Sequence, residues 1–216
     1  MPSYKGIDKF ARIDSINYLT IKYLTSILSE KQSLKYGFPS HIILTQKQSA
    51  DGKIRFFSWN ENTGSAMVSN VNIVQYQTAE GPKSMYLEWV GDTAHYPIAA
   101  TVPTQVYRME SGDEYDWYVL LSRGKACTDC PYLGAWAFCV TKDTLLIHQP
   151  VFDSISSSYT WAMDNEKRPN LTYKNNRLVY SYSYVRLPED SLGLPEEIVE
   201  TQNFVFDKNT NQFVKE

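Results

Sequence analysis

Closely spaced turn signals divide most of this chain into short segments, and this pattern limits the fold more than any other feature of the sequence. The segments "HIILTQKQ" and "KIRFFSWN" flank "SADG", where Asp51 and Gly52 supply the left-handed backbone positions that a hairpin turn needs. Turn residues in "TAEGPK", "ESGDE", "TKD", "KNN" and "KNTN" predict five further hairpins. The sequence therefore predicts ten or more short strands.

Aromatic residues are unusually frequent, with 16 Tyr, 9 Phe and 5 Trp among 216 residues. Together with Val, Ile and Thr, such residues favour half-buried pleated surfaces over helices. Hydrophobic residues make up 43% of the chain and charged residues 21%, which is ordinary for a globular protein and too apolar for a disordered one. We therefore expect a mainly β protein of the α+β class.

Residues 14–34, "DSINYLTIKYLTSILSEKQSL", are the one stretch with a helical pattern, and Asp14 or Ser15 is placed to cap it. Gly37 and Pro39 in "YGFP" mark its end. Its apolar residues recur at helical spacing: Ile16, Leu19, Tyr23 and Ile27, with Ile21, Leu24 and Leu28 beside them. The wide apolar face predicts a long N-terminal helix packed on a sheet.

We expect one domain over residues 1–216, in which a helical segment at 1–39 covers an antiparallel β region at 40–216. About ten strands would form either a β-sandwich or a strongly twisted open sheet. The acidic stretch "RLPEDSLGLPEEIVE", residues 186–200, contains two prolines and a glycine. It is therefore predicted to be a surface loop before the last hairpin and not a domain boundary.

The charge pattern bears on partners and location. A net charge of −3, with both signs mixed along the chain, offers no electrostatic footprint for nucleic acid. There is no run of eighteen apolar residues, so we expect no membrane span, and the first residues do not form a signal peptide. The expected location is periplasmic, envelope or extracellular if a signal was removed, and otherwise cytoplasmic.

All three cysteines lie in "CTDCPYLGAWAFC", at Cys127, Cys130 and Cys139. A structural zinc site needs four ligands, usually as paired knuckles, and the spacing of His148 matches no such arrangement. A redox C-x-x-C motif is expected at a helix N-terminus, whereas the flanking segments here indicate strand and turn. We predict no metal and a disulfide between Cys127 and Cys130, with Cys139 as a small buried residue on the strand face of Ala135 and Ala137.

Carboxylates cluster in "ESGDEYDW", where Glu114 and Asp116 would point the same way on a strand, roughly 6 to 7 Å apart at Cα. Paired carboxylates at such a separation can act as acid and base in glycoside hydrolysis. An acidic cluster around a glycine-containing turn is also typical of a solvated turn, which is the interpretation we favour. No nucleophile elbow, zinc-protease motif or phosphate-binding loop occurs in the sequence.

In "RLVYSYSYVR", Tyr180, Tyr182 and Tyr184 fall on one face of a predicted strand while Ser181 and Ser183 fall on the other. A row of tyrosines offers flat apolar area with polar ends and could bind a sugar or a peptide. The alternative is that the row packs under the helix or against a second sheet, with the serines facing water.

The segment "DGKIRFFSWNENTGSAM" combines Asp51, Gly52, Lys53 and Arg55 with Ser58, Trp59, Thr63 and Gly64, and "V-x-Q-Y" follows at Gln75 and Tyr76. With the helical N-terminus and the C-terminal "F-D-x-x-T" hairpins, this order resembles a group of uncharacterised secreted or envelope bacterial proteins of all-β character. The match covers mainly residues 50–77 and departs at Ser65, where members of the group have a second glycine. The resemblance implies location and fold and no activity. From the residues themselves, Arg55 and Trp59 share a strand face where a cation can lie near an indole ring.

These observations predict a non-catalytic secreted or envelope protein without a cofactor, which binds a glycan or a protein partner through an aromatic-rich β face. Its candidate ligand-binding residues are Arg55, Trp59, Tyr180, Tyr182 and Tyr184. The rival hypothesis is a carbohydrate-active hydrolase that uses Glu114 and Asp116. A third is a purely structural subunit, in which the tyrosines only stabilise the fold.

Overall fold

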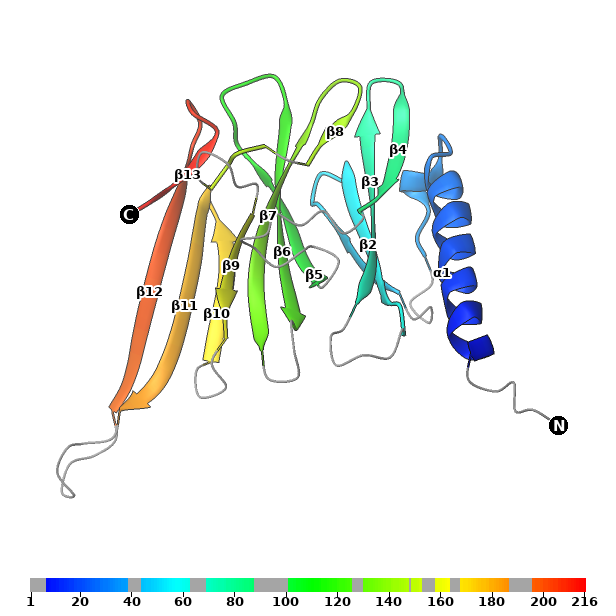
Figure 1. Ribbon diagram of the computed structural model, residues 1–216. Coiled ribbons are helices and arrows are strands. Elements are labelled where there is room, and N and C mark those ends of the chain that lie inside the picture. The colour runs from blue at the N-terminus through cyan, green and yellow to red at the C-terminus, as the bar shows by residue number, and fades with distance from the viewer. Residues whose placement is uncertain are drawn as a thin grey trace.

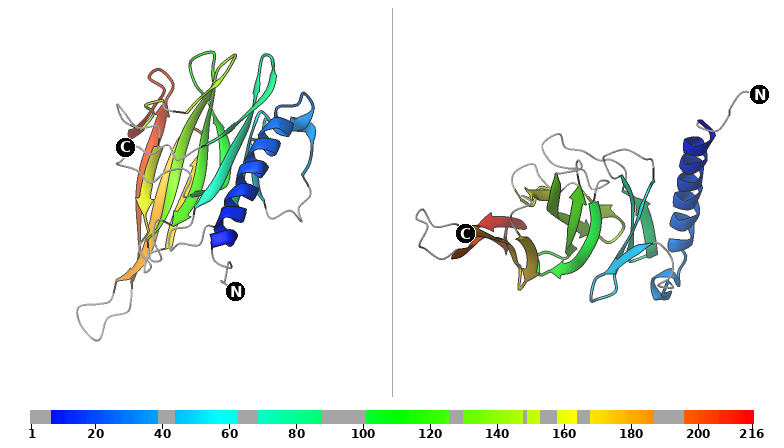
Figure 2. Two further views of the ribbon diagram at one scale, coloured as in Figure 1. Left: turned by 45° about the vertical axis from the view of Figure 1, so that its right-hand side comes forward. Right: turned by 90° about the horizontal axis from the view of Figure 1, so that it is seen from below.

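The computed structural model describes residues 7–38, 44–62, 69–87, 101–125, 130–147, 149–152, 158–163, 168–186 and 196–216. Within them, one helix and three antiparallel sheets are stacked face to face in the order in which they occur along the chain (Figure 1 and Figure 2, right). The mainly β fold with one N-terminal helix is as predicted.

The N-terminal sheet contains four strands, β1 to β4, joined as consecutive hairpins. The central sheet contains β5 to β9, and β9 pairs with β7. The C-terminal sheet contains β10 to β13, again as consecutive neighbours. The strands are β1 Thr45–Gln48, β2 Ile54–Asn60, β3 Asn70–Thr78, β4 Gly81–Tyr86, β5 Thr101–Met109, β6 Asp116–Lys125, β7 Pro131–Val140, β8 Leu145–Leu146, β9 Ser158–Ala162, β10 Arg168–Lys174, β11 Arg177–Arg186, β12 Glu196–Asp207 and β13 Gln212–Lys215.

The six predicted hairpins are all present, and their turn residues explain why they form. Gly52 has φ +72° in the turn between β1 and β2, a conformation that a residue with a Cβ rarely adopts. Asn175 and Asn176 have φ of 51° and 58° between β10 and β11, as a two-residue type I′ turn requires. Local turn chemistry therefore sets the register of each pair.

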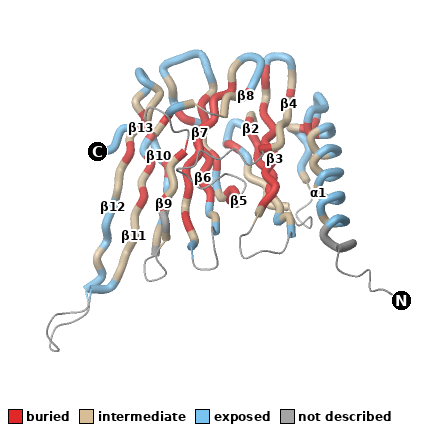
Figure 3. The backbone as a smooth tube through the Cα atoms, in the orientation of Figure 1, coloured by how far each residue is buried: buried red, intermediate tan, exposed pale blue. Residues whose placement is uncertain are grey.

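The central sheet is covered on both faces, which explains why β6 and β7 are buried along most of their length (Figure 3). Alternate residues such as Tyr118, Trp136 and Phe138 pack toward the N-terminal sheet. The intervening residues, such as Trp117 and Cys139, pack toward the C-terminal sheet. Two hydrophobic cores on opposite faces of one sheet thus join the three sheets.

The helix differs from its prediction at both ends. Helix α1 covers Ile7–Leu28, and a separate 3₁₀ turn covers Ser33–Lys35. It begins early because "IDKFARI" contains good helix formers and no proline or glycine. Ser15 consequently lies inside the helix, where its hydroxyl donates to the carbonyl of Ala11, so the predicted N-cap is wrong.

The predicted loop at 186–200 is wrong in its last part. Residues 196–200 begin β12, which pairs with β11 over ten positions, from Arg177 opposite Val205 to Arg186 opposite Glu196. Exposed acidic side chains are compatible with a strand whose outer edge faces water. Residues 187–195 lie outside the described part of the chain.

Candidate functional site

The tyrosine row on β11 lies on the face of the C-terminal sheet that is turned toward the central sheet. The inner end of the row, at Tyr180, lies in the core between these two sheets. The register of β11 and β12 places Gln202 beside Tyr180, Glu200 beside Tyr182, and Ile198 beside Tyr184. We call Tyr180, Tyr182 and Tyr184, with Trp161 and Glu200, the tyrosine ladder. It runs from the hydrophobic core out along the long β11–β12 hairpin, which projects beyond the other strands (Figure 1).

The inner end of the ladder belongs to the core. Tyr180 is only 5% exposed, and its ring stacks on Trp161 with centroids 5.2 Å apart and an interplanar angle of 12°. The indole nitrogen of Trp161 donates to the side-chain oxygen of Gln202 at 3.2 Å. Burial raises the pKa of Tyr180. Tyr180 therefore confirms the interpretation that part of the row packs against a second sheet.

The outer end of the ladder is accessible. Tyr182 and Tyr184 are partly exposed, and their rings stack with centroids 6.2 Å apart at 27°. Both hydroxyls donate to the carboxylate of Glu200, that of Tyr184 at 3.1 Å. The hydrogen bond to Glu200 raises the pKa of Tyr182 to about 12. The result is a flat apolar surface with an oriented carboxylate at its edge.

Arg55 does not take part in this surface. It is 1% exposed, and it donates to the carbonyls of Ser33 and Tyr36, each at 2.7 Å, and to the side-chain oxygen of Gln75. Burial lowers its pKa.

The expectation that the Arg55 cation lies near Trp59 is wrong. The guanidinium lies over the rings of Phe57 and Phe38, at 4.9 and 5.2 Å from their centroids, because Phe57 is the nearer neighbour on the same strand face. Gln75 donates to the carbonyl of Leu28, the last residue of α1. The "R" and "Q" of the motif at 50–77 thus hold the end of the helix on the N-terminal sheet.

Trp59 also serves the contact between helix and sheet. Its indole nitrogen donates to the side-chain oxygen of Asn17 at 3.1 Å, and the Asn17 amide donates to the carbonyl of Glu61. Trp59 packs with Phe57 and Ile21 in the cluster under α1. Arg55 and Trp59 therefore lie on the N-terminal sheet, at the opposite end of the stack from the tyrosine ladder (Figure 1).

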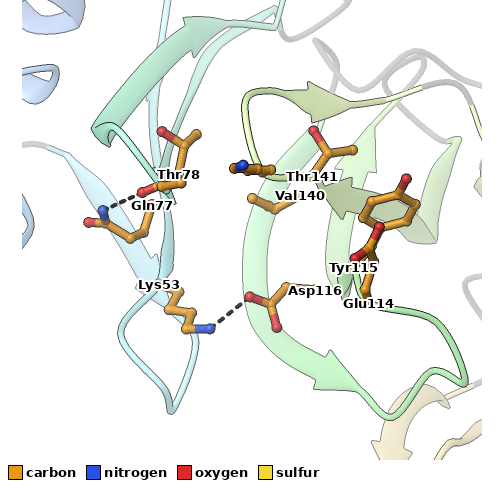
Figure 4. Close-up of a pocket in the computed structure, with 10 residues that line it drawn as sticks. Lys53, Gln77, Thr78, Glu114, Tyr115, Asp116, Val140 and Thr141 are labelled. Carbon is orange, nitrogen blue, oxygen red and sulfur yellow. Dashed lines mark hydrogen bonds and ion pairs between the residues drawn. The ribbon is translucent and has the colours of Figure 1, made fainter.

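Glu114 and Asp116 line a cleft of about 420 Å³ between the N-terminal and central sheets (Figure 4). Lys53, Gln77 and Lys142 line the same cleft. The two oxygens of Asp116 are each held by a cation, Oδ2 by Lys53 at 2.7 Å and Oδ1 by Arg108 at 2.5 Å. The cleft can hold a small polar molecule, but Asp116 is committed to joining the two sheets.

Asp51 reinforces this junction. Its carboxylate accepts hydrogen bonds from the hydroxyl groups of Ser49 at 2.5 Å and Tyr118 at 2.9 Å, and from the backbone N–H of Lys53. Burial opposes the ionisation of Asp51, but these hydrogen bonds lower its pKa overall. The sequence identified Asp51 only as a turn residue, because its bond to Tyr118 spans 67 positions of the chain.

The cysteines are divided between two states. Cys139 is a free thiol buried in β7, as predicted, and burial raises its pKa to about 12, with Asp113 and Asp116 adding to the effect. Cys130 is disulfide-bonded. Cys127 lies outside the described residues, so its pairing with Cys130 stays a prediction. Within the described part of the chain, no three His, Cys, Asp or Glu side chains are placed to hold a metal ion.

Comparison of this chain with protein-family models, with curated proteins and with solved structures finds no match. Nor is the one helix among the described residues long and apolar enough to cross a membrane.

The sequence missed Trp161 and Glu200 as members of the ladder. The strand period singles out only the tyrosines of β11, assigns no partner to Trp161, and leaves Glu200 at the end of the predicted loop at 186–200. A register between β11 and β12 that continues to Arg186 and Glu196 would have placed Glu200 beside Tyr182. The one sequence signal for this register is the pair of opposite charges that it brings together, Arg186 and Glu196, at the end of the two strands.

Proposed function

We propose that this protein is a non-catalytic binding protein of the bacterial cell envelope or exterior, and that it recognises a glycan through the outer end of the tyrosine ladder. The observation that carries the proposal is the stacked, partly exposed pair Tyr182 and Tyr184 with Glu200 between their hydroxyls. A buried pair would serve only the fold, whereas this pair offers its surface to a ligand.

The chemistry of this surface suits a sugar. One face of a pyranose ring is mostly C–H and packs on a flat aromatic ring, while its edge carries hydroxyl donors. A carboxylate accepts hydroxyl hydrogen bonds more strongly than a neutral oxygen does. Tyr182 and Tyr184 supply the apolar area, and their hydroxyls together with Glu200 form a hydrogen-bonded polar edge that a sugar hydroxyl can join. Stacked side chains on paired strands also lose little freedom on binding.

Two features support a location outside the cytoplasm. Cys130 is disulfide-bonded, and such bonds persist mainly in oxidising compartments. The motif at residues 50–77 resembles secreted and envelope bacterial proteins. The described residues of that motif, from Asp51 to Gln75, hold helix and sheets together, so in this account the motif stabilises the fold and the ladder binds the ligand.

The proposal is tested by screening the full chain on an array of bacterial-surface and plant oligosaccharides. We expect binding by the wild type and by Ser183→Ala, which alters the opposite face of the same strand. We expect loss of binding by Tyr182→Ala and Tyr184→Ala. Tyr36→Ala, which removes a tyrosine that is 70% exposed elsewhere, should bind like the wild type. An array that captures all variants equally would contradict the proposal.

The cleft beside Glu114 and Asp116 is the one observation that favours the rival hydrolase. If it were catalytic, folded Glu114→Gln and Asp116→Asn variants would lose turnover of an oligosaccharide that the wild type cleaves. We expect no cleavage by the wild type, because both oxygens of Asp116 are engaged by Lys53 and Arg108. Turnover that both substitutions abolish would establish the hydrolase.

A further inference from the structure

The first part of β12 forms an open edge of the C-terminal sheet. β12 pairs with β11 from Glu196 to Val205, whereas β13 pairs only with its last four residues, Phe204 to Asp207. No other described strand pairs with β12. In Figure 1, β13 accordingly lies beside one end of β12 only. Residues 196–202 therefore have a partner strand on one side and none on the other, and we call them the open edge.

Two hydrogen bonds show which backbone groups point outward along the open edge. On the β13 side of the strand, the carbonyl of Asn203 accepts a hydrogen bond from the N–H of Glu216 at 3.0 Å. On the β11 side, the N–H of Phe206 donates to the carbonyl of Asn176 at 2.8 Å. Backbone groups alternate between the two sides of an antiparallel strand, so the odd-numbered residues of the open edge direct their N–H and C=O groups outward. These residues are Glu197, Val199 and Thr201.

The outward backbone groups are accessible. Glu197, Val199 and Thr201 are all exposed, Val199 to 63%. Within the described part of the chain, no hydrogen bond reaches their backbone from the outer side. A second extended chain alongside them would complete three pairs with two hydrogen bonds each. Recognition of this kind, in which a peptide adds a strand to a sheet, draws its affinity from the main chain and its specificity from alternate side chains.

The charges differ between the two ends of the open edge. Glu196 and Glu197 lie at one end, and neither forms an ion pair within the described part of the chain. Glu196 has Arg186 opposite it on β11, whereas Glu197 has Val185. Lys215 on β13 lies beyond the other end. Opposite charges on paired strands stabilise a sheet, so a partner strand is favoured when its cations lie at the end of Glu196 and Glu197.

We propose that the open edge binds an extended basic segment of another protein, which joins the C-terminal sheet as an antiparallel strand. In this orientation the segment runs from Thr201 toward Glu196, so its last two residues lie opposite Glu197 and Glu196 and are cationic. The residues before them lie opposite Val199 and Ile198 and are apolar, since apolar cross-strand pairs also stabilise a sheet. The pattern that fits is therefore two apolar residues followed by two cations. The proposal does not depend on what the tyrosine ladder binds.

A second copy of this chain fits the open edge poorly. If two open edges overlapped completely in antiparallel orientation, Glu196 of one copy would lie opposite Gln202 of the other. Glu216 already lies opposite the next residue, Asn203, and successive positions along a strand are only about 3.3 Å apart, so the two chains would collide there. Each copy would also bring three carboxylates into the contact, those of Glu196, Glu197 and Glu200. A separate segment that begins opposite Thr201 stays clear of Glu216 and brings cations to the acidic end.

The probe is the peptide Thr-Thr-Val-Val-Lys-Lys, acetylated and amidated at its ends, titrated into the isotope-labelled full chain and followed by NMR. In the proposed register its residues lie opposite Thr201 to Glu196. We expect a Kd on the order of 0.1 to 1 mM, because a short flexible peptide loses much freedom when it is ordered. Replacement of both lysines by threonine should weaken binding about fivefold, as for two exposed ion pairs.

Hydrogen exchange tests the backbone pairing itself. When nine-tenths of the chain carries peptide, exchange at the N–H groups of Glu197, Val199 and Thr201 should slow by about tenfold. The N–H groups of Ile198 and Glu200 point toward β11 and should change little. N-methylation of the first valine of the peptide removes a donor that faces Val199 and should abolish binding. N-methylation of the second valine, whose N–H points away from β12, is the matched control and should be tolerated.

Val199→Pro tests the same contact from the side of the protein. Proline is tolerated on an edge strand where the lost N–H faced water, so the variant should fold and lose peptide binding. Val199→Ala should bind within about twofold of the wild type. The proposal is overturned if the wild type binds no peptide, or if N-methylation of the first valine leaves binding unchanged. It is also overturned if the wild type self-associates and Val199→Pro abolishes that association, since the open edge would then pair with a second copy.

Discussion

Trp161 on β9 and Tyr180 on β11 stack with their ring planes 12° apart, which joins the buried core to the exposed end of the tyrosine ladder. One alternation of residues along β11 therefore serves two purposes. Tyr180 is buried and contributes to stability, whereas Tyr182 and Tyr184 are accessible. Substitutions along this row should therefore separate stability from binding.

Replacement of Tyr180 by alanine should lower the free energy of unfolding by about 3 kcal/mol, as for other large buried rings. Tyr182→Ala should cost less than about 1 kcal/mol, because that ring is partly exposed. Chemical denaturation of the two variants measures both values. If Tyr182→Ala were as destabilising as Tyr180→Ala and left glycan binding unchanged, the ladder would be structural throughout.

The hydrogen bond between Tyr182 and Glu200 predicts a pH dependence. It raises the pKa of Tyr182 to about 12 in the folded chain, against roughly 10 in an unfolded one. The stabilisation from this group is therefore complete below about pH 10 and is lost as the pH rises toward about 12. Tyr182→Phe should lose less stability than the wild type across this interval, measured by denaturation at fixed pH values. Equal losses would show that the bond does not form in solution.

Glu200→Gln tests the same hydrogen bond by changing its acceptor. The pKa of Tyr182 should fall toward its ordinary value of about 10, because a neutral amide stabilises the protonated hydroxyl less than a carboxylate does. Ultraviolet titration of tyrosinate formation measures this change. Glu197→Gln, on the opposite face of the same strand, is the control and should leave the titration as it is in the wild type.

Arg55→Met should destabilise the protein by about 3 kcal/mol, since hydrogen bonds to a charged group each contribute roughly 1.5 to 3 kcal/mol. The substitution leaves the carbonyls of Ser33 and Tyr36 without their donor and loosens the end of α1 from the sheet. Arg186→Met, at an exposed position of β11, is the control. A loss no greater than that of the control would mean that water replaces the guanidinium at little cost.

The cysteines give a prediction that mass spectrometry checks directly. Alkylation of the native, unreduced protein should modify no cysteine. Cys127 and Cys130 are predicted to form a disulfide, and Cys139 is buried with its pKa raised to about 12. Alkylation after unfolding without reductant should modify one, Cys139. Three modified cysteines would show that the protein carries no disulfide and would remove one support for an oxidising compartment.

Much of the fold could be predicted because it depends on local sequence signals. Turn residues such as Asp51 and Gly52 define the hairpins, and the alternation in β7 correctly separated Cys139 from the neighbours that face the other way. The stacking of three sheets could not be predicted. It depends on the pairing of distant surfaces, for which the sequence offers only the indirect signal that β6 and β7 are apolar on both faces.

The candidate site was predicted in part for the same reason. The tyrosine row follows from the period of one strand, but its division into a buried and an exposed end depends on Trp161 from β9 and Glu200 from β12. Arg55 and Trp59 were predicted to bind a ligand because they share a strand face where a cation can lie near an indole ring. Their burial under α1 became visible only with the packing of the helix.

An NMR titration of the labelled full chain with the best-bound oligosaccharide of the array shows whether the outer end of the ladder binds a glycan. We expect the largest chemical-shift changes at Tyr182, Tyr184 and Glu200. Changes that cluster instead at Lys53, Glu114 and Lys142 would place the ligand in the cleft between the N-terminal and central sheets and would overturn the proposed function.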